Sequence, residues 1–328
     1  MEKWWKQMLA VMMLGVLMPR VMLAIGIGAA QEPASEEQTE PGTTEQTQHE
    51  ETVNSIYIPV LTGQGNVTVM ELEDYVKGVV LAEMPASFEE EALKAQAVVA
   101  RTYAMRRLTE ADRHSDGAIC TDPSCCQAYI SEEEYLQNRG GPDSAGKIAR
   151  AVEGTAGLVL TYEGELIEAT YFSCSGGRTE DAAAVWGTDV PYLQAVDSPG
   201  EEEAAVYWAQ ISFSAGEFAA RLGRTLTGTP QSWLGKVMYT DGGGVDAMVI
   251  GGITYSGTQL RKLLGLNSTA FTMTADNNGI TVETLGRGHR VGMSQYGADA
   301  MAVTGSSYEE ILSYYYQGTR IDKLSALG

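Results

Sequence analysis

Glu83 is the residue of this 328-residue chain best placed for acid–base chemistry, because it is the one carboxylate in a mostly apolar run from 75 to 88. Pro85 disfavours helical backbone angles at the residue before it, so the sequence predicts a helix over about 71–83 that ends near Glu83. A carboxylate at the negative end of a helix, among apolar neighbours, favours its protonated form and has a raised pKa. That suits a general acid, whereas the alternative is a solvent-facing glutamate with no catalytic role.

Several short motifs follow Glu83 in a fixed order. They are Glu83-Met-Pro85, Ala92-Leu-Lys-Ala-Gln-Ala-Val98, Arg101-Thr-Tyr103, Tyr171-Phe-Ser-Cys-Ser-Gly-Gly177, Trp186-Gly-Thr-Asp-Val-Pro-Tyr192 and Gly286-Arg-Gly-His-Arg-Val-Gly-Met-Ser-Gln-Tyr-Gly-Ala298. Together they resemble the stage II sporulation protein D family of peptidoglycan lytic transglycosylases, over about residues 55–322. The resemblance implies cleavage of the MurNAc–GlcNAc bond with formation of 1,6-anhydro-MurNAc. It also implies that the substrate is glycan strands lacking stem peptides and that the cleavage serves engulfment in endospore formation.

A lytic transglycosylase needs one carboxyl group, whereas an ordinary glycoside hydrolase needs two. The single acid, Glu83 here, protonates the glycosidic oxygen and then accepts the proton of the muramic-acid C6 hydroxyl that closes the anhydro ring. A second hypothesis is a non-catalytic glycan-binding activator of a cell-wall amidase, since related sequences are called amidase enhancers. A third is a cysteine hydrolase that uses Cys174 or Cys126 with a histidine, although no nucleophile motif supports it.

Polar side chains in the motifs are candidates for substrate binding. They are Lys94, Arg101, Tyr171, Ser173, Ser175, Gly176, His289, Ser294, Gln295 and Tyr296. Lys94 and Arg101 could donate to carbonyl or lactyl oxygens of the glycan, or could instead be an exposed lysine and a salt-bridged arginine. The segment with Tyr171, Ser173, Ser175 and the pair Gly176-Gly177 suggests a sugar contact close to the backbone, with strand termination by the glycines as the alternative. The roles of the residues from 289 to 296 come from the resemblance.

His114, Cys120 and Cys126 are spaced evenly by six residues in a loop rich in Asp, Gly, Ser and Pro. One imidazole and two thiolates are ligands suited to zinc, and the resemblance implies the same, because some clostridial members carry zinc at matching positions. Cys125 could compete as a ligand. The alternative is disulfides or free thiols, as expected for four cysteines outside the cytoplasm, although adjacent cysteines cannot easily pair with each other. We expect such a zinc to be structural.

The N-terminus predicts a membrane anchor. Lys3 and Lys6 precede an apolar stretch from 8 to 30, whose 23 residues would rise ~35 Å as a helix, enough to span a bilayer. Arg20 would cost ~2.5–3.5 kcal/mol near the middle of such a span. We therefore predict a single-pass signal-anchor over 1–30, with the rest on the extracytoplasmic side of the cell membrane. The alternative is a cleaved signal peptide and a secreted protein.

Residues 31–54 contain seven glutamates and no Lys or Arg, which predicts a disordered acidic linker. Removing the linker's −7 and the +2 of residues 1–30 from the net charge of −21 leaves −16 for residues 55–328. A field of that sign repels phosphate and excludes nucleic acid as a partner. The resemblance implies peptidoglycan glycan strands, a stage II sporulation protein P amidase and a stage II sporulation protein M scaffold as partners.

Helical and strand-like segments are segregated along residues 55–328, which favours an α+β catalytic body of helices and antiparallel sheets. The sequence also allows a lobe inserted at about 200–280. A capping box at Ser87-Phe-Glu-Glu90 predicts a helix that runs to about Leu108. Other expected elements are strands at Leu158–Tyr162 and Leu166–Phe172, a helix at Ser212–Arg221 with Ser214 as its cap, and β-rich segments at Val237–Tyr255 and Phe271–Leu285.

Overall fold

The computed structural model describes residues 55–63, 65–110, 114 and 117–327. These belong to one compact unit of mixed helices and mainly antiparallel sheets, so the α+β class is confirmed. Within this part of the chain, no helix combines the length and the apolar character that a bilayer crossing requires. The predicted anchor at 1–30 and the predicted linker at 31–54 lie outside the described residues.

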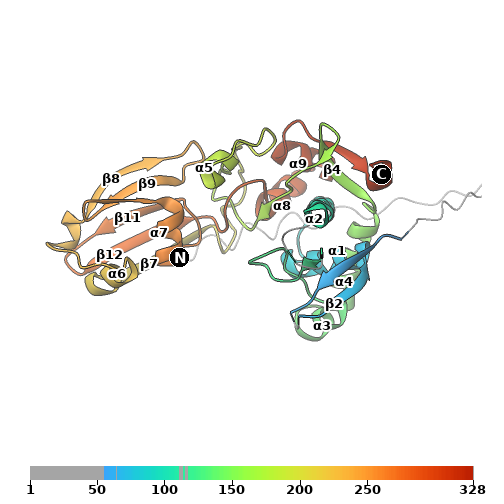
Figure 1. The fold of residues 1–328 in the computed structure, drawn as a ribbon, viewed down its shortest axis with the longest axis horizontal. Helices are drawn as coiled ribbons and strands as arrows, with labels where there is room; N and C mark the ends of the chain where they lie inside the picture. The colour runs from blue at the N-terminus through green and yellow to red at the C-terminus, as the bar shows by residue number, and fades with distance from the viewer. Residues whose placement is uncertain (1–54, 64, 111–113, 115–116, 328) are drawn as a thin grey trace, which may run out of the picture. The chain divides into compact units, whose positions relative to one another are not determined.

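The helix α2 (Glu90–Thr109) is the centre of the main hydrophobic core. It packs against α1 (Leu72–Glu83), α4 (Pro142–Glu153), α8 (Gln295–Val303) and α9 (Tyr308–Tyr315), as Figure 1 shows. Alanines fill much of its surface and are fully buried, which lets four helices approach one axis closely. The position of Glu83 at the end of α1 is therefore fixed by close packing.

Short strands surround this helical core. The sheet β2-β1-β3 comprises Val67–Glu71, Tyr57–Leu61 and Ile119–Cys120, and the sheet β14-β4-β5 comprises Arg320–Lys323, Leu158–Tyr162 and Glu165–Leu166. A parallel pair joins β6 (Tyr171–Phe172) to β13 (Met293–Ser294), so two motifs more than 100 residues apart in sequence lie side by side. The short helices are α3 (Glu132–Asn138) and α5 (Ala182–Trp186).

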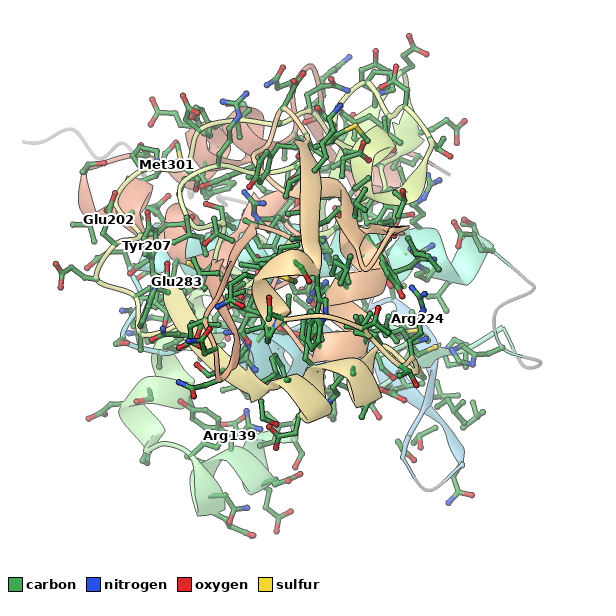
Figure 2. All side chains as sticks on the ribbon, turned by 90° about the vertical axis from the view of Figure 1, so that its left-hand side faces the viewer. Arg139, Glu202, Tyr207, Arg224, Glu283 and Met301 are labelled. Atoms are coloured by element: carbon green, nitrogen blue, oxygen red, sulfur yellow. The ribbon has the colours of Figure 1, made fainter. Side chains whose placement is uncertain are left out.

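A second hydrophobic core lies in the segment 208–285, where the sequence allows an inserted lobe. Its aromatic centre is Phe213, Phe218 and Trp233, and Figure 2 looks onto this segment, with the exposed Glu283 of β12 labelled. The sheet β11-β12-β7 comprises Phe271–Ala275, Gly279–Leu285 and Trp208–Ser214, and β10-β9-β8 comprises Ile253–Ser256, Val245–Ile250 and Leu234–Tyr239. The helices are α6 (Ala215–Arg221), α7 (Gly257–Leu264) and the 3-10 turn Pro230–Ser232.

Local signals predicted some boundaries and missed others. The first helix ends at Glu83 as predicted, with Met84 extended before the proline, and the cap at Ser214 is confirmed as a full capping box. The capping box predicted at Ser87 is wrong, because α2 begins after Glu89. Phe88 turns inward and is buried, and the amide of Glu89 donates to Asp299 at 2.7 Å.

Two strand boundaries also differ from the sequence prediction. The expected strand Leu166–Phe172 is broken, because Leu166 pairs with β4 whereas Tyr171 pairs with β13. The helix predicted from Ser212 starts at Ala215, since residues 212–214 belong to β7 and pair with β12. Both corrections arise from tertiary pairing, which a local pattern does not contain.

Arg101 joins three elements of the main core. Its guanidinium is fully buried and forms a fork with Glu73 of α1, at 2.9 Å from Nε and 2.5 Å from Nη2. It also donates to the carbonyl of Leu158 in β4 at 3.0 Å. A buried charge needs such pairing, so the ion pair fixes α1, α2 and β4 relative to one another.

We predict that Glu73→Ala strongly destabilises the protein, because it leaves the Arg101 charge buried without a partner. The free energy of unfolding, measured by urea denaturation, should fall by about 3–5 kcal/mol. The control is Glu132→Ala, which removes the exposed partner of Lys77 and should cost less than about 1 kcal/mol. Equal effects of the two substitutions would contradict this role for Arg101.

Candidate functional site

A cavity of about 1040 Å³ opens where the motif segments meet. Its wall includes Glu83, the loop 123–126, the segment 170–173, Trp186 and the segment 287–289. Leu266 and Asn267, which follow α7 of the second core, complete it. The volume is large enough for several sugar units, and the wall combines aromatic rings with charged groups, as saccharide sites require.

Three donors converge on the Glu83 carboxyl group. Its Oε1 atom accepts hydrogen bonds from the amide of Ala128 at 3.2 Å and from the Tyr171 hydroxyl at 3.3 Å. Its Oε2 atom accepts from Nε2 of Gln295 at 3.4 Å. The structure thus brings together Glu83, Tyr171 and Gln295, which the sequence analysis selected from three distant motifs.

Burial raises the pKa of Glu83, and the three hydrogen bonds lower it by a smaller amount. The raised pKa of Glu83 agrees with the sequence prediction, although its dominant cause is desolvation and not the position of Glu83 at the helix end. The carboxyl group therefore holds its proton to higher pH than an exposed glutamate does. The same donors can stabilise the carboxylate once the proton has left, so the group is suited to act as acid and then as base.

A second layer of side chains orients these donors. The Tyr171 hydroxyl accepts from Nε2 of Gln127 at 3.1 Å, and the Gln127 oxygen accepts from the Tyr75 hydroxyl at 3.3 Å. Burial raises the pKa of Tyr171 well above its ordinary value, so it stays a phenol that can donate to Glu83. The chain Tyr75–Gln127–Tyr171 fixes the direction of that donated bond.

The loop that carries Gln127 and Ala128 begins at a cluster of metal-ligand side chains. Ligand atoms of His114, Cys120, Cys125 and Cys126 all lie within 4.8 Å of one another. Nε2 of His114 is 3.5 Å from the sulfurs of Cys125 and Cys126, and these sulfurs are 4.0 Å apart. A tetrahedral zinc site would require about 3.6 Å between N and S ligands and about 3.8 Å between sulfurs. His114, Cys125 and Cys126 therefore match the spacing of tetrahedral zinc ligands, and the Cys120 sulfur lies within 4.8 Å of all three.

Cys125 enters this cluster as a fourth candidate ligand, beyond the three selected from spacing. All four cysteines of the chain are free, which is the state a metal cluster requires. The pKa of the Cys126 thiol is raised to about 12 by burial, so formation of its thiolate needs a nearby cation. The cluster could bind a metal next to the loop that donates to Glu83.

Glu201 organises the motif from 171 to 177, and sequence analysis missed it. One buried oxygen of Glu201 accepts from the amides of Ser175 and Gly176 at 2.7 and 3.1 Å, and from the Ser175 hydroxyl at 2.9 Å. The Cys174 thiol donates to it as well, at 3.0 Å, and burial raises the pKa of that thiol to about 12. Cys174 is thus held protonated, which argues against its use as a nucleophile.

His289 forms part of the aromatic wall of the cavity. Its ring lies 5.6 Å from the ring of Phe172 and 5.7 Å from that of Trp186, measured between centroids. Burial, with the nearby charge of Arg261, lowers the pKa of His289 to about 4. The imidazole is neutral near pH 7 and offers a flat apolar face with one polar edge.

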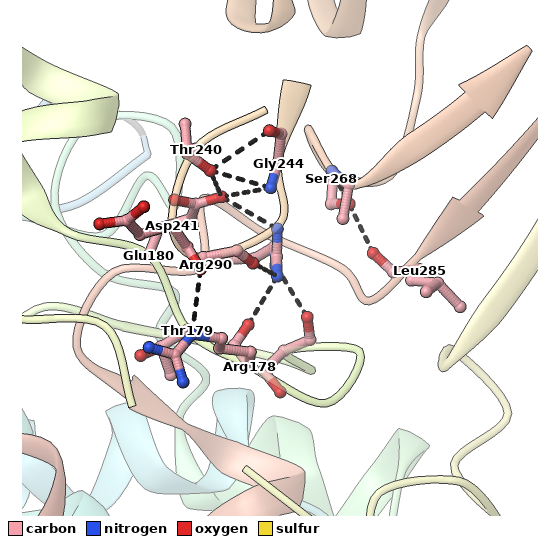
Figure 3. Close-up of polar contacts among 12 residues, drawn as sticks. Arg178, Thr179, Glu180, Thr240, Asp241, Gly244, Ser268, Leu285 and Arg290 are labelled. Atoms are coloured by element: carbon pink, nitrogen blue, oxygen red, sulfur yellow. Dashed lines mark hydrogen bonds and ion pairs between the residues drawn. The ribbon is translucent and has the colours of Figure 1, made fainter. Parts of the chain in front are cut away.

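Arg290 holds this wall in place (Figure 3). It adopts a left-handed backbone conformation at φ 68° and donates to the carbonyls of Ser175, Arg178 and Gly242 at 2.6–2.7 Å. It also pairs with the buried Glu180 at 3.2 Å. Since Gly242 belongs to the segment with the second core, Arg290 ties that segment to the cavity wall.

Several of the predicted residues do not line the cavity. Lys94 pairs with Glu90 and Glu91, and Arg101 is committed to the core, so neither of the two is placed to contact substrate. Ser175 and Gly176 hold Glu201, Ser294 caps α8, and Tyr296 packs edge-on against Phe88 at 4.9 Å. Ser173, Tyr171 and His289 do line the cavity.

The fold and the site define an α+β protein with a largely buried acid on a cavity beside a candidate metal cluster. A family model described as "Stage II sporulation protein" matches residues 62–162. The chain is 43% identical to Stage II sporulation protein D of Bacillus subtilis (strain 168), over 83% of this chain and 80% of that protein. It is 42% identical to Stage II sporulation protein D of Bacillus amyloliquefaciens, over 82% and 79% respectively.

A third relative is named "Amidase enhancer", from Bacillus subtilis (strain 168). It is 31% identical over 75% of this chain and 40% of its own length. These relatives confirm the resemblance noted from the motifs. The chain belongs to the stage II sporulation protein D family of sporulation proteins.

We predict that Glu83 makes the stability of the protein fall as pH rises. The unfolded chain releases the Glu83 proton near the ordinary glutamate pKa of 4.5, whereas the folded chain holds it to higher pH. Between the two pKa values the wild type should lose about 1.4 kcal/mol per pH unit relative to Glu83→Gln, which has no proton to release. Urea denaturation from pH 4 to 8 measures this difference. The exposed control Glu134→Gln should track the wild type, and a constant gap for Glu83→Gln would contradict the raised pKa.

Proposed function

We propose that this protein is a peptidoglycan lytic transglycosylase that cleaves the MurNAc–GlcNAc bond and leaves 1,6-anhydro-MurNAc ends. The single observation that carries the proposal is one largely buried carboxyl group with a raised pKa, on a cavity whose other carboxylate is paired with arginines. Membership of a sporulation family supports a role in engulfment. Glycan strands lacking stem peptides are the proposed substrate.

The second carboxylate on the cavity is Glu168. Among the described residues that line the cavity, it and Glu83 are the two carboxyl groups. Arg107 donates to one oxygen of Glu168, and Nε of Arg106 donates to the other at 3.3 Å. An ordinary glycosidase needs a second carboxylate free to act as base or nucleophile. Because Glu168 is occupied by two guanidinium groups, a reaction with one acid is favoured.

The proposed reaction uses Glu83 twice. As an acid, it transfers its proton to the glycosidic oxygen while the bond from that oxygen to C1 of muramic acid breaks. Donors from Ala128, Tyr171 and Gln295 stabilise the carboxylate that forms. The carboxylate then accepts the proton of the C6 hydroxyl as that oxygen bonds to C1. The ring closes without water, and Glu83 recovers its proton.

Zinc is the metal we propose for the cluster of His114, Cys120, Cys125 and Cys126, since three sulfurs and one nitrogen suit its tetrahedral preference. With four protein ligands the ion would be structural and would hold the loop in place. The amide of Ala128, two residues after the last thiolate, is one of the donors to Glu83. The metal would thus support the acid without entering the reaction.

The cellular setting remains part of the proposal. We propose a single-pass anchor at residues 1–30, with the catalytic body outside the cytoplasm, or alternatively secretion after signal cleavage. A stage II sporulation protein P amidase would supply the strands, and a stage II sporulation protein M scaffold would recruit both enzymes. A non-catalytic amidase activator is the second candidate, favoured by the name of one relative.

We predict that Glu83→Gln abolishes glycan cleavage while glycan binding stays nearly intact, because the amide keeps the shape but has no transferable proton. The rate should fall by about 10²–10⁴-fold or more, as for loss of a general acid. Mass spectrometry of products from denuded strands should find anhydro-MurNAc ends with wild type and with the exposed control Glu134→Gln. Reducing ends would indicate a hydrolase, and no new ends with wild type would favour the activator.

We predict about one zinc per chain in the purified protein. Cys126→Ser should lose the metal, because removal of a thiolate eliminates a principal ligand. Cys174→Ser is the matched control: that thiol hydrogen-bonds to Glu201, outside the cluster, so its zinc content should equal that of wild type. Elemental analysis measures both. Full zinc in Cys126→Ser would overturn the ligand assignment.

A further inference from the structure

Two arginines on the cavity wall have no partner among the described residues. Arg261 belongs to α7 and Arg287 follows β12, and both line the cavity. Across the described part of the chain, neither guanidinium forms an ion pair or a hydrogen bond. Arg107, on the same cavity, differs in pairing with Glu168 and Glu110.

Unpaired arginines are unexpected in this protein. The chain has 43 acidic and 22 basic residues, so potential partners for a cation are abundant. Arg261 is nevertheless partly buried, and burial lowers its pKa, which means that its charge has lost hydration without gaining a counter-ion. A desolvated charge is costly unless something pairs with it. An anion bound in the cavity would provide that pairing.

The other titratable groups of the cavity leave this positive charge uncompensated. Burial raises the pKa of Glu83 and so favours its neutral form, and Glu168 is paired with Arg106 and Arg107. His289, next to Arg261, is uncharged because its pKa is lowered to about 4. The cavity lining therefore combines one acid, Glu83, with two cationic donors, Arg261 and Arg287.

We propose that Arg261 and Arg287 bind the lactyl carboxylate of a muramic acid whose stem peptide has been removed. This inference rests on the proposed function, because it takes glycan as the substrate. A muramic acid that carries a stem peptide has an uncharged amide at this position, and N-acetylglucosamine has no acid there. Removal of the peptide creates one carboxylate per disaccharide, and planar guanidinium groups match a carboxylate well.

The assignment gives the second hydrophobic core a role in substrate choice. Arg261 is on a helix of that core, and Arg287 is held by two backbone hydrogen bonds to Cys174, at 2.7 and 3.1 Å. The helical core supplies the acid, and the segment 208–287 supplies the groups that distinguish peptide-free strands from substituted ones. Arg261 and Arg287 are thus specificity-determining residues.

The test measures binding without cleavage, in the full-length Glu83→Gln protein. The probes are peptide-free glycan strands, the same strands with each lactyl carboxylate converted to its methylamide, and a chitin oligosaccharide that lacks the lactyl group. The carboxylate strands should bind at least tenfold more tightly than the methylamide strands, and added salt should reduce this preference. Adding Arg261→Gln and Arg287→Gln should abolish the preference while binding of the methylamide strands and chitin is retained.

The matched control is Lys262→Gln, which removes one positive charge from the exposed residue next to Arg261, outside the cavity wall. It should keep the full preference. Arg287→Gln alone changes an exposed side chain and should reduce the preference, which guards against misfolding of the double variant. The inference is overturned if Glu83→Gln does not distinguish the first two probes, if Lys262→Gln matches the double variant, or if the double variant loses all three probes equally.

Product analysis of the wild type separates this inference from the proposed reaction. If the wild type forms no anhydro ends but Glu83→Gln prefers the carboxylate strands, the reaction is wrong and the carboxylate site is supported. If anhydro ends form and the preference is absent, the reaction stands and the carboxylate site is overturned. Absence of binding to any glycan would overturn both.

Discussion

Burial of the Glu83 carboxyl group is the constraint on which the rest of the site depends. The carboxyl group must be desolvated enough for its pKa to stay raised, yet it must open onto a cavity that would admit a glycan strand in the proposed reaction. Close packing around α2 shields one side of the carboxyl group from water, because the buried alanines of α2 let α1 approach closely. The donors of Ala128, Tyr171 and Gln295 offset part of the cost once the proton is transferred. Each donor comes from a different segment, so the acid functions only in the complete fold.

Each donor is held by its own support. The loop of Ala128 follows the ligand cluster, and a bound metal would hold the start of that loop in place. Tyr171 lies on a strand paired with β13, and its hydroxyl is oriented by Gln127. Gln295 begins α8, which packs on α2. The proposed one-acid reaction would depend on this preorganisation, because a single carboxyl group has to act first as the acid and then as the base.

Sequence signals that act over a few residues correctly predicted the helix ends and caps that depend on neighbouring residues alone. Pro85 ends α1 at Glu83, and Ser214 caps α6, because both signals act within one turn of the residue. The box at Ser87 fails because burial of Phe88 outweighs a cap bond. The motifs selected Glu83, Tyr171 and Gln295, which the fold brings together, but they did not indicate that Glu201 accepts hydrogen bonds from Ser175 and Gly176. Cys125 and the unpaired arginines are similar cases, since only the folded chain determines which groups meet or remain without a partner.

Arg290 connects the segment that contains the second core to the wall of the cavity. A left-handed backbone at a residue other than glycine costs on the order of 1–3 kcal/mol, so the surrounding bonds must hold it. Three carbonyls and the buried Glu180 do so. One of these acceptors, Gly242, belongs to the segment 208–285, whereas another, Ser175, belongs to the motif 171–177. A buried ion pair adds little net stability, but it penalises every arrangement that separates its partners. Because His289 directly precedes Arg290, the Arg290–Glu180 ion pair also helps to hold the aromatic wall of the cavity. In the proposed reaction, the arginines that bind the glycan and the acid that cleaves it would thereby be held in one fixed geometry.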